Sequence, residues 1–134
     1  MRRAFADTHF YLALLNDYDP AHAAACAFLA PGGVEQFVTT GWVLLELANA
    51  MSRSPRRARC RDFIGRLQGS DNTRIIPLSD ALQNRGLKLF GDRSDKAWSL
   101  TDCISFIVME EEGLTEALTG DHHFEQAGFV ALLA

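Results

Sequence analysis

The chain has 134 residues, of which 48% are hydrophobic and 22% charged, and this size and balance predict one compact domain over residues 1–134. No apolar run approaches the roughly 20 residues that a membrane span needs, and three cysteines at long spacings do not form the pattern of a disulfide framework. The net charge of −4 argues against a surface that coats nucleic acid throughout. We therefore expect a cytoplasmic protein with no membrane segment.

Short apolar runs alternate with amphipathic stretches, which is the pattern of βα units around a parallel sheet. In chain order we expect a strand at residues 4–6, helices at 8–15 and 21–29, a strand at 36–39, helices at 42–52 and 55–68, a strand at 74–78, helices at 79–90 and 99–112, a strand at 117–119, a short helix near Phe124 and an edge strand at 129–132. The prediction is an α/β fold, a three-layer α/β/α sandwich with a central parallel sheet of about five strands.

Local signals set the expected boundaries. Pro55 suits the first turn of a helix, whereas Pro77 weakens the case for a strand as far as residue 78. The polar segment 91–96 is expected to be a loop. Ser99 or Thr101 is expected to cap the helix that ends near residue 112.

Four acidic residues are the candidate functional side chains. Asp7 and Asp121 directly follow predicted strands, where ligands of open parallel sheets bind, although each can also be a simple helix cap. Asp102 completes a capping-box pattern with Ser99. Glu46 lies opposite the apolar stripe of its helix and can face solvent, but that helix is apolar nearly all round.

Carboxylates gathered in one place repel one another, and a hard cation such as Mg²⁺ or Mn²⁺ makes such a cluster tolerable. A cation of this kind supplies charge neutralisation, substrate orientation and water activation for phosphodiester hydrolysis. The residues leave open whether one ion or two would bind.

Four segments of the sequence resemble the PIN-domain family, and in particular the VapC-type toxins of bacterial toxin–antitoxin pairs. The matching segments are Ala4–His9, Thr39–Asn49, Trp98–Cys103 and Ala117–Phe129. The last of these, which contains Leu-Thr-Gly-Asp-His-His-Phe at residues 118–124, is the most specific. Together they span nearly the whole chain in the family's order.

The resemblance implies a five-stranded parallel sheet between helices and an Mg²⁺- or Mn²⁺-dependent endoribonuclease that is the toxin of a type II system, with RNA as substrate, a cognate antitoxin and a homodimer as partners. The acidic site that it implies consists of Asp7, Glu46, Asp102 and Asp121. Thr8 and Thr101 match positions beside these acids and are expected to support them. Many relatives have a bulkier residue at Gly120, so a looser backbone is expected before Asp121.

Other interpretations remain open. A non-catalytic RNA- or protein-binding PIN module is the main alternative, while a phosphatase or receiver domain is disfavoured because Asp7-Thr8-His9 lacks a second acid. Six arginines lie within residues 53–66, and this segment can contact RNA phosphates, receive an acidic partner or simply be solvated. The four histidines lack a zinc spacing and are assigned no catalytic role; they are His9, His22, His122 and His123.

Overall fold

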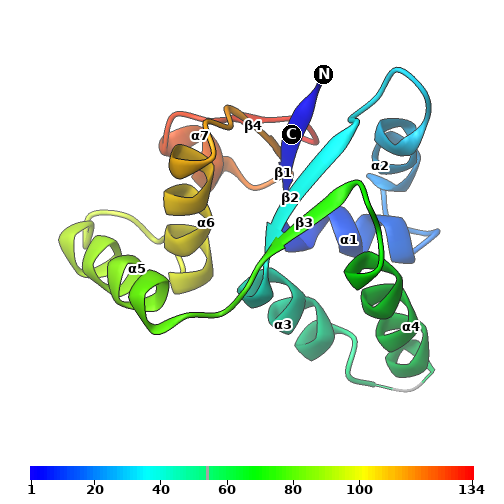
Figure 1. Ribbon diagram of the computed structural model, residues 1–134, viewed down its shortest axis with the longest axis horizontal. Coiled ribbons are helices and arrows are strands. Elements are labelled where there is room, and N and C mark those ends of the chain that lie inside the picture. The colour runs from blue at the N-terminus through cyan, green and yellow to red at the C-terminus, as the bar shows by residue number, and fades with distance from the viewer. Residues whose placement is uncertain (54) are drawn as a thin grey trace.

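Five strands form one sheet in the computed structural model of the protein, which describes residues 1–53 and 55–134 (Figure 1). The strands are β1 (Arg3–Ala6), β2 (Gln36–Thr40), β3 (Thr73–Ile76), β4 (Glu116–Leu118) and β5 (Val130–Ala131). Their order is β3-β2-β1-β4-β5, and each neighbouring pair is parallel. The predicted α/β fold with a central parallel sheet of about five strands is confirmed.

Helices cover both faces of this sheet (Figure 1). They are α1 (Thr8–Leu15), α2 (His22–Leu29), α3 (Gly41–Ala50), α4 (Arg56–Gln68), α5 (Asp80–Asp92), α6 (Leu100–Glu111) and α7 (His122–Gln126). In Figure 1, α1 to α4 lie on one side of the sheet and α5 to α7 on the other. None of these described helices is long and apolar enough to span a bilayer.

The core lies between the sheet and these two helical layers. Residues 4–6 of β1 are fully buried, because this central strand has helices on both faces. Gly86 of α5 permits a close approach to α6, since the side chain of Ile104 occupies the space that a Cβ at residue 86 would need.

Several helices and strands end a few residues away from the predicted positions. The strand expected at 74–78 ends at Ile76, because Pro77 has no N–H for the ladder. Helix α5 continues to Asp92, so the first two residues of the loop expected at 91–96 are helical. Helix α3 ends at Ala50 rather than Ser52. Ser54, within the arginine-rich segment 53–66, lies outside the described residues.

The chain order of the strands creates a switch point between β1 and β4. From β1 the chain crosses to β2 on one side, whereas β4 pairs with β1 on the other side. Ala6 and Leu118, the last residues of these two strands, are register partners. The crevice beyond such a switch point is the usual ligand site of an open parallel sheet.

Candidate active site

One hollow at this switch point brings the four predicted acids together. It has a volume of about 520 Å³ and is lined by Asp7, Thr8, His9, Leu12, Glu46, Ala97, Ser99, Asp102, Gly120, Asp121 and His123. Asp7 follows β1 and Asp121 lies three residues beyond β4, while Glu46 comes from α3 and Asp102 from α6. Residues more than a hundred positions apart in the sequence therefore line the same pocket.

Asp7 is one of the two buried acids of this pocket. It is 7% exposed, and its Oδ2 accepts a hydrogen bond of 2.8 Å from the Thr119 hydroxyl. Burial raises the pKa of Asp7 from 3.8 to about 7; the Thr119 bond opposes this rise, and the nearby charges of Asp102 and Glu46 add to it. Thr119, which sequence reasoning missed, also accepts a bond of 3.1 Å from the Asp121 amide and so connects two of the acids.

Asp102 has the capping role that the sequence suggested and lines the pocket as well. The Ser99 hydroxyl accepts from the Asp102 amide at 3.0 Å, and Asp102 Oδ2 accepts from the Ser99 amide at 3.1 Å. Ser99, not Thr101, is the cap. Among the described residues, the supporting position predicted for Thr101 does not contribute to the pocket lining, and the Thr101 carbonyl accepts from the Ser105 hydroxyl instead.

Glu46 is exposed on α3 and still reaches the pocket. The Thr8 hydroxyl donates to Glu46 Oε1 at 2.6 Å, and this bond holds the long side chain toward the other acids. Thr8 therefore occupies the supporting position predicted for it. Its role in the chemistry stays a prediction.

His9 and Gly120 fix the turn before Asp121. The Gly120 amide donates to His9 Nδ1 at 2.9 Å. A Cβ at residue 120 would lie 2.7 Å from His9 Cε1, so the imidazole fills the space beside the glycine. The histidine ring holds the glycine amide, and a backbone looser than in relatives stays a prediction.

Sequence reasoning missed the two histidines of the pocket wall. His9 and His123 both line it, although neither has a zinc-like spacing to another histidine. The one signal for His123 is its position two residues after the strand-end acid Asp121. His123 Nδ1 lies 3.0 Å from Asp102 Oδ2 and 3.4 Å from Asp121 Oδ1.

The donor atoms of this pocket fit a divalent metal ion. Its described lining contains four carboxylates and no Lys or Arg, so no permanently charged cationic side chain there balances the acids. Carboxylate oxygens suit Mg²⁺ and Mn²⁺. Ligand atoms of Asp121, His122 and His123 also lie within 4.8 Å of one another.

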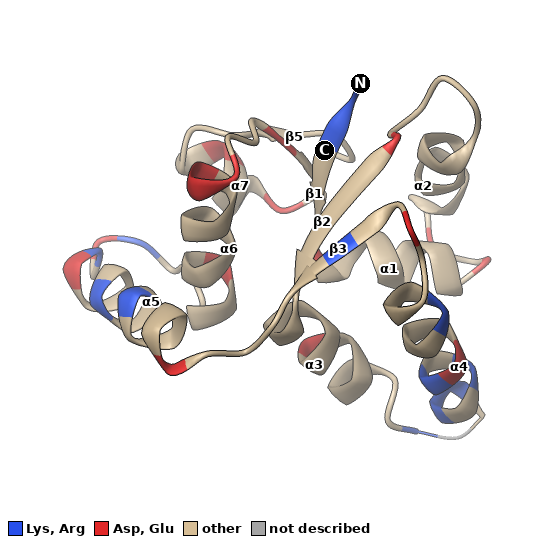
Figure 2. Cartoon of the chain, viewed as in Figure 1, with Lys and Arg blue, Asp and Glu red and all other residues tan. Residues whose placement is uncertain are grey.

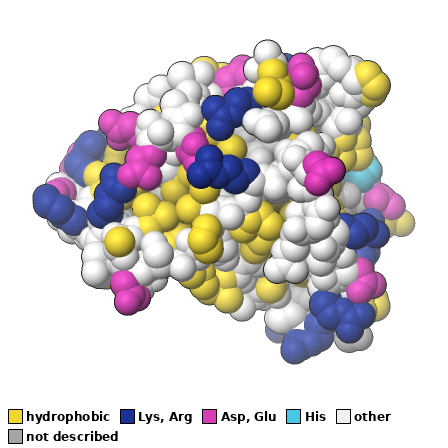
Figure 3. Space-filling model, viewed as in Figure 1, with side chains coloured by type: hydrophobic (Ala, Val, Ile, Leu, Met, Phe, Trp, Pro, Cys, Tyr) yellow, Lys and Arg dark blue, Asp and Glu magenta, His cyan; other side chains and the backbone are white. Residues whose placement is uncertain are grey.

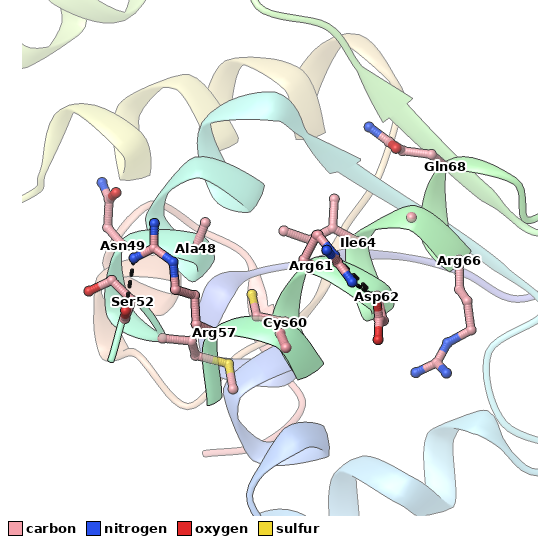
Figure 4. A pocket seen from close by; sticks show the side chains of 13 residues that line it. Ala48, Asn49, Ser52, Arg57, Cys60, Arg61, Asp62, Ile64, Arg66 and Gln68 are labelled. Atoms are coloured by element: carbon pink, nitrogen blue, oxygen red, sulfur yellow. Dashed lines mark hydrogen bonds and ion pairs between the residues drawn. The ribbon is translucent and has the colours of Figure 1, made fainter. Parts of the chain in front are cut away.

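A larger groove of about 1140 Å³ lies away from the acids, between α3 and α4 (Figure 4). Its apolar lining includes Ala48 and Ile64. Figure 4 shows Arg57 reaching the Ser52 carbonyl, at 3.0 Å, and Arg61 paired with Asp62 at 2.9 Å. The concentration of basic residues along α4 is visible in Figure 2.

An open parallel sheet with acids gathered at its switch point defines a ligand-binding protein of the doubly wound α/β class. A family model described as the PIN domain matches residues 4–130. The chain therefore belongs to the PIN-domain family.

Solved structures confirm the resemblance to VapC-type toxins. VapC20 of Mycobacterium tuberculosis, described as a toxin that cleaves the sarcin–ricin loop, is 26% identical with a TM-score of 0.84, over 95% of this chain and 96% of that chain. VapBC2 from Rickettsia felis, bound to a fragment of its promoter DNA, is 14% identical with a TM-score of 0.66, over 96% of each chain. A toxin–antitoxin complex from Klebsiella pneumoniae is 18% identical with a TM-score of 0.64, over 96% of this chain and 97% of that chain. No curated protein sequence matches the chain.

Proposed function

We propose that this PIN-domain protein is a divalent-metal-dependent endoribonuclease that serves as the toxin of a toxin–antitoxin pair. The observation that carries the proposal is the convergence of four carboxylates on one pocket whose described lining has no Lys or Arg. A structural neighbour that cleaves the sarcin–ricin loop supports RNA as the substrate class.

Some side chains of the pocket would bind the metal ion, and others hold those side chains in place. Asp7, Glu46, Asp102 and Asp121 are the residues that would hold Mg²⁺ or Mn²⁺. Thr119 anchors the first of these through Oδ2, and Thr8 anchors the glutamate through Oε1. When bound, the ion supplies charge neutralisation and water activation for phosphodiester cleavage.

Cleavage assays test this proposal. Ribosomal, transfer and messenger RNA are incubated with the wild-type protein and with Asp7→Asn, each with Mg²⁺, Mn²⁺ or EDTA. The matched control is Asp71→Asn, at an exposed position outside the pocket. We expect cutting by the wild type and the control with metal, and none by Asp7→Asn or with EDTA.

Two results contradict the proposal. Equal cutting by the wild type and Asp7→Asn would place the activity elsewhere or in a contaminant. RNA binding without cutting under every metal condition would favour the non-catalytic PIN module. The second result is read from a gel-shift titration on the same RNA samples.

We also propose the groove between α3 and α4 as the surface that binds the antitoxin. The Rickettsia felis and Klebsiella pneumoniae neighbours are toxin–antitoxin complexes. The groove combines an apolar floor with arginines, among them Arg57 and Arg61, so it complements an acidic amphipathic helix. Arg57→Glu is expected to weaken antitoxin binding in a titration and leave RNA cleavage unchanged; unchanged binding would exclude this surface.

A second copy of the chain is the further partner that we propose. Figure 3 shows hydrophobic side chains gathered between α5 and β3, and Leu78, Leu87 and Phe90 are exposed large hydrophobic residues. Apolar patches of this kind commonly mark association surfaces. A monomer across the accessible concentration range in analytical ultracentrifugation would contradict the homodimer.

A further inference from the structure

His123 connects two acids that come from different parts of the fold. It is the second residue of α7, and its Nδ1 lies 3.0 Å from Asp102 Oδ2, at the start of α6, and 3.4 Å from Asp121 Oδ1, just before α7. Both neighbours are carboxylate oxygens, which accept hydrogen bonds when ionised. Nδ1 therefore carries the proton and donates.

This donation orients Asp102. The Oδ2 atom of Asp102 accepts both from His123 and from the Ser99 amide, whereas no hydrogen bond reaches Oδ1 within the part of the chain that the structure describes. One oxygen of the carboxylate is thus anchored by the protein and the other is left for a ligand. Hydrogen bonds to ligating carboxylates commonly orient them in metal sites.

A second contact holds α7 against the segment before α6. The Trp98 indole N–H donates to Gln126 Oε1 at 2.9 Å, and the Phe106 and Phe124 rings meet edge to face with centroids 5.0 Å apart. The backbone around His123 is therefore fixed relative to α6 independently of its imidazole. Removing the imidazole is expected to release the Oδ2 atom of Asp102 from its His123 bond without detaching α7.

We propose that His123 is a positioning residue of the metal site, which sets the orientation of Asp102 through its Nδ1–H, while its backbone amide holds Asp121. This inference rests on the proposed metal-dependent function. Glu125 of the same helix provides the comparison, because it is exposed and does not line the pocket, whereas His122 has a possible ligand atom close to those of Asp121 and His123.

The test measures Mn²⁺ binding instead of cleavage. Free Mn²⁺ is followed by electron paramagnetic resonance during titration of the wild type, His123→Leu, His123→Asn and Glu125→Gln. Asparagine retains an N–H donor at the position of Nδ1, whereas leucine has none. We expect His123→Leu to bind Mn²⁺ about 10- to 100-fold more weakly, His123→Asn to recover most of that loss, and Glu125→Gln to match the wild type.

Each other outcome has a defined meaning. Wild-type affinity in His123→Leu, with an unchanged thermal transition, overturns the positioning role. Equal losses in His123→Asn and His123→Leu, or a nitrogen coupling to bound Mn²⁺ that disappears in both, make the imidazole a direct ligand and also overturn it. Failure of the wild type to bind Mn²⁺ rejects the proposed metal site itself, and this inference with it.

Discussion

Replacing Asp7 with Asn tests whether the metal-free fold holds this carboxylate at an energetic cost. Burial raises the pKa of Asp7 from 3.8 to about 7, and each tenfold change in proton affinity corresponds to about 1.36 kcal/mol. Above neutral pH, the ionised Asp7 therefore lowers the free energy of unfolding by up to about 4 kcal/mol. Asparagine has nearly the same shape and no charge, and its carbonyl oxygen can accept the Thr119 hydrogen bond.

The sign of the pH dependence follows from proton binding. Between about pH 4 and pH 7 the folded protein holds a proton on Asp7 that the unfolded chain has lost, so the free energy of unfolding decreases as the pH rises through this window and then levels off. The Asn variant lacks this slope. Without metal, we expect Asp7→Asn to be more stable than the wild type by up to about 4 kcal/mol near pH 8, and nearly equal to it near pH 4.

Urea unfolding in EDTA, followed by tryptophan fluorescence at several pH values, measures this difference. Asp71→Asn, at an exposed position, is the control and is expected to follow the wild type. Mn²⁺ should narrow the difference, because a ligand at about 100 times its Kd stabilises the folded state that binds it by about 2.7 kcal/mol, and the wild type is expected to bind the ion more tightly than Asp7→Asn does. A metal-free Asp7→Asn protein that is less stable than the wild type near pH 8 would refute the reasoning.

Three further substitutions have defined outcomes. Gly120→Ala places a Cβ 2.7 Å from His9 Cε1 and is expected to lower the free energy of unfolding by about 1–3 kcal/mol in urea denaturation, with part of the loss recovered when His9 is also changed to Ala. Thr8→Val removes the hydrogen bond to Glu46 and is expected to weaken Mn²⁺ binding about tenfold in calorimetry; an unchanged Kd would exclude a supporting role. Leu87→Glu puts a charge on the exposed apolar face of α5, and sedimentation should show fewer dimers than with the wild type.

The sequence was sufficient for the sheet and for the location of the acids. Strand-end positions identify Asp7 and Asp121, and the parallel-sheet rule brings such positions to one edge. Asp102 could be placed at a helix start by its pattern with Ser99, because a capping box depends on residues three apart. Each of these inferences uses local spacing and one topological rule.

The remaining contacts depend on side-chain directions that spacing does not determine. Whether Glu46 faces solvent or the pocket is decided by the Thr8 hydroxyl, which comes from a different helix. The same limit applies to His9, whose ring fills space that exists because residue 120 is glycine. The end of α5 was misplaced for a more local reason, since the polar composition of residues 91–96 favoured a loop, whereas the helix continues to Asp92.

Three of the four acids lie at helix N-termini, and this arrangement lowers the cost of gathering negative charge in one pocket. Asp7 and Asp121 precede α1 and α7, and Asp102 is in the first turn of α6, where the positive end of the helix dipole favours negative charge. Asp102 also accepts from the Ser99 amide and from His123. Asp7 is equally buried, but its side chain does not cap α1, and its Oδ2 accepts from the neutral hydroxyl of Thr119. The cost of the metal-free state is therefore concentrated at Asp7, which makes this residue the most sensitive reporter of ion binding.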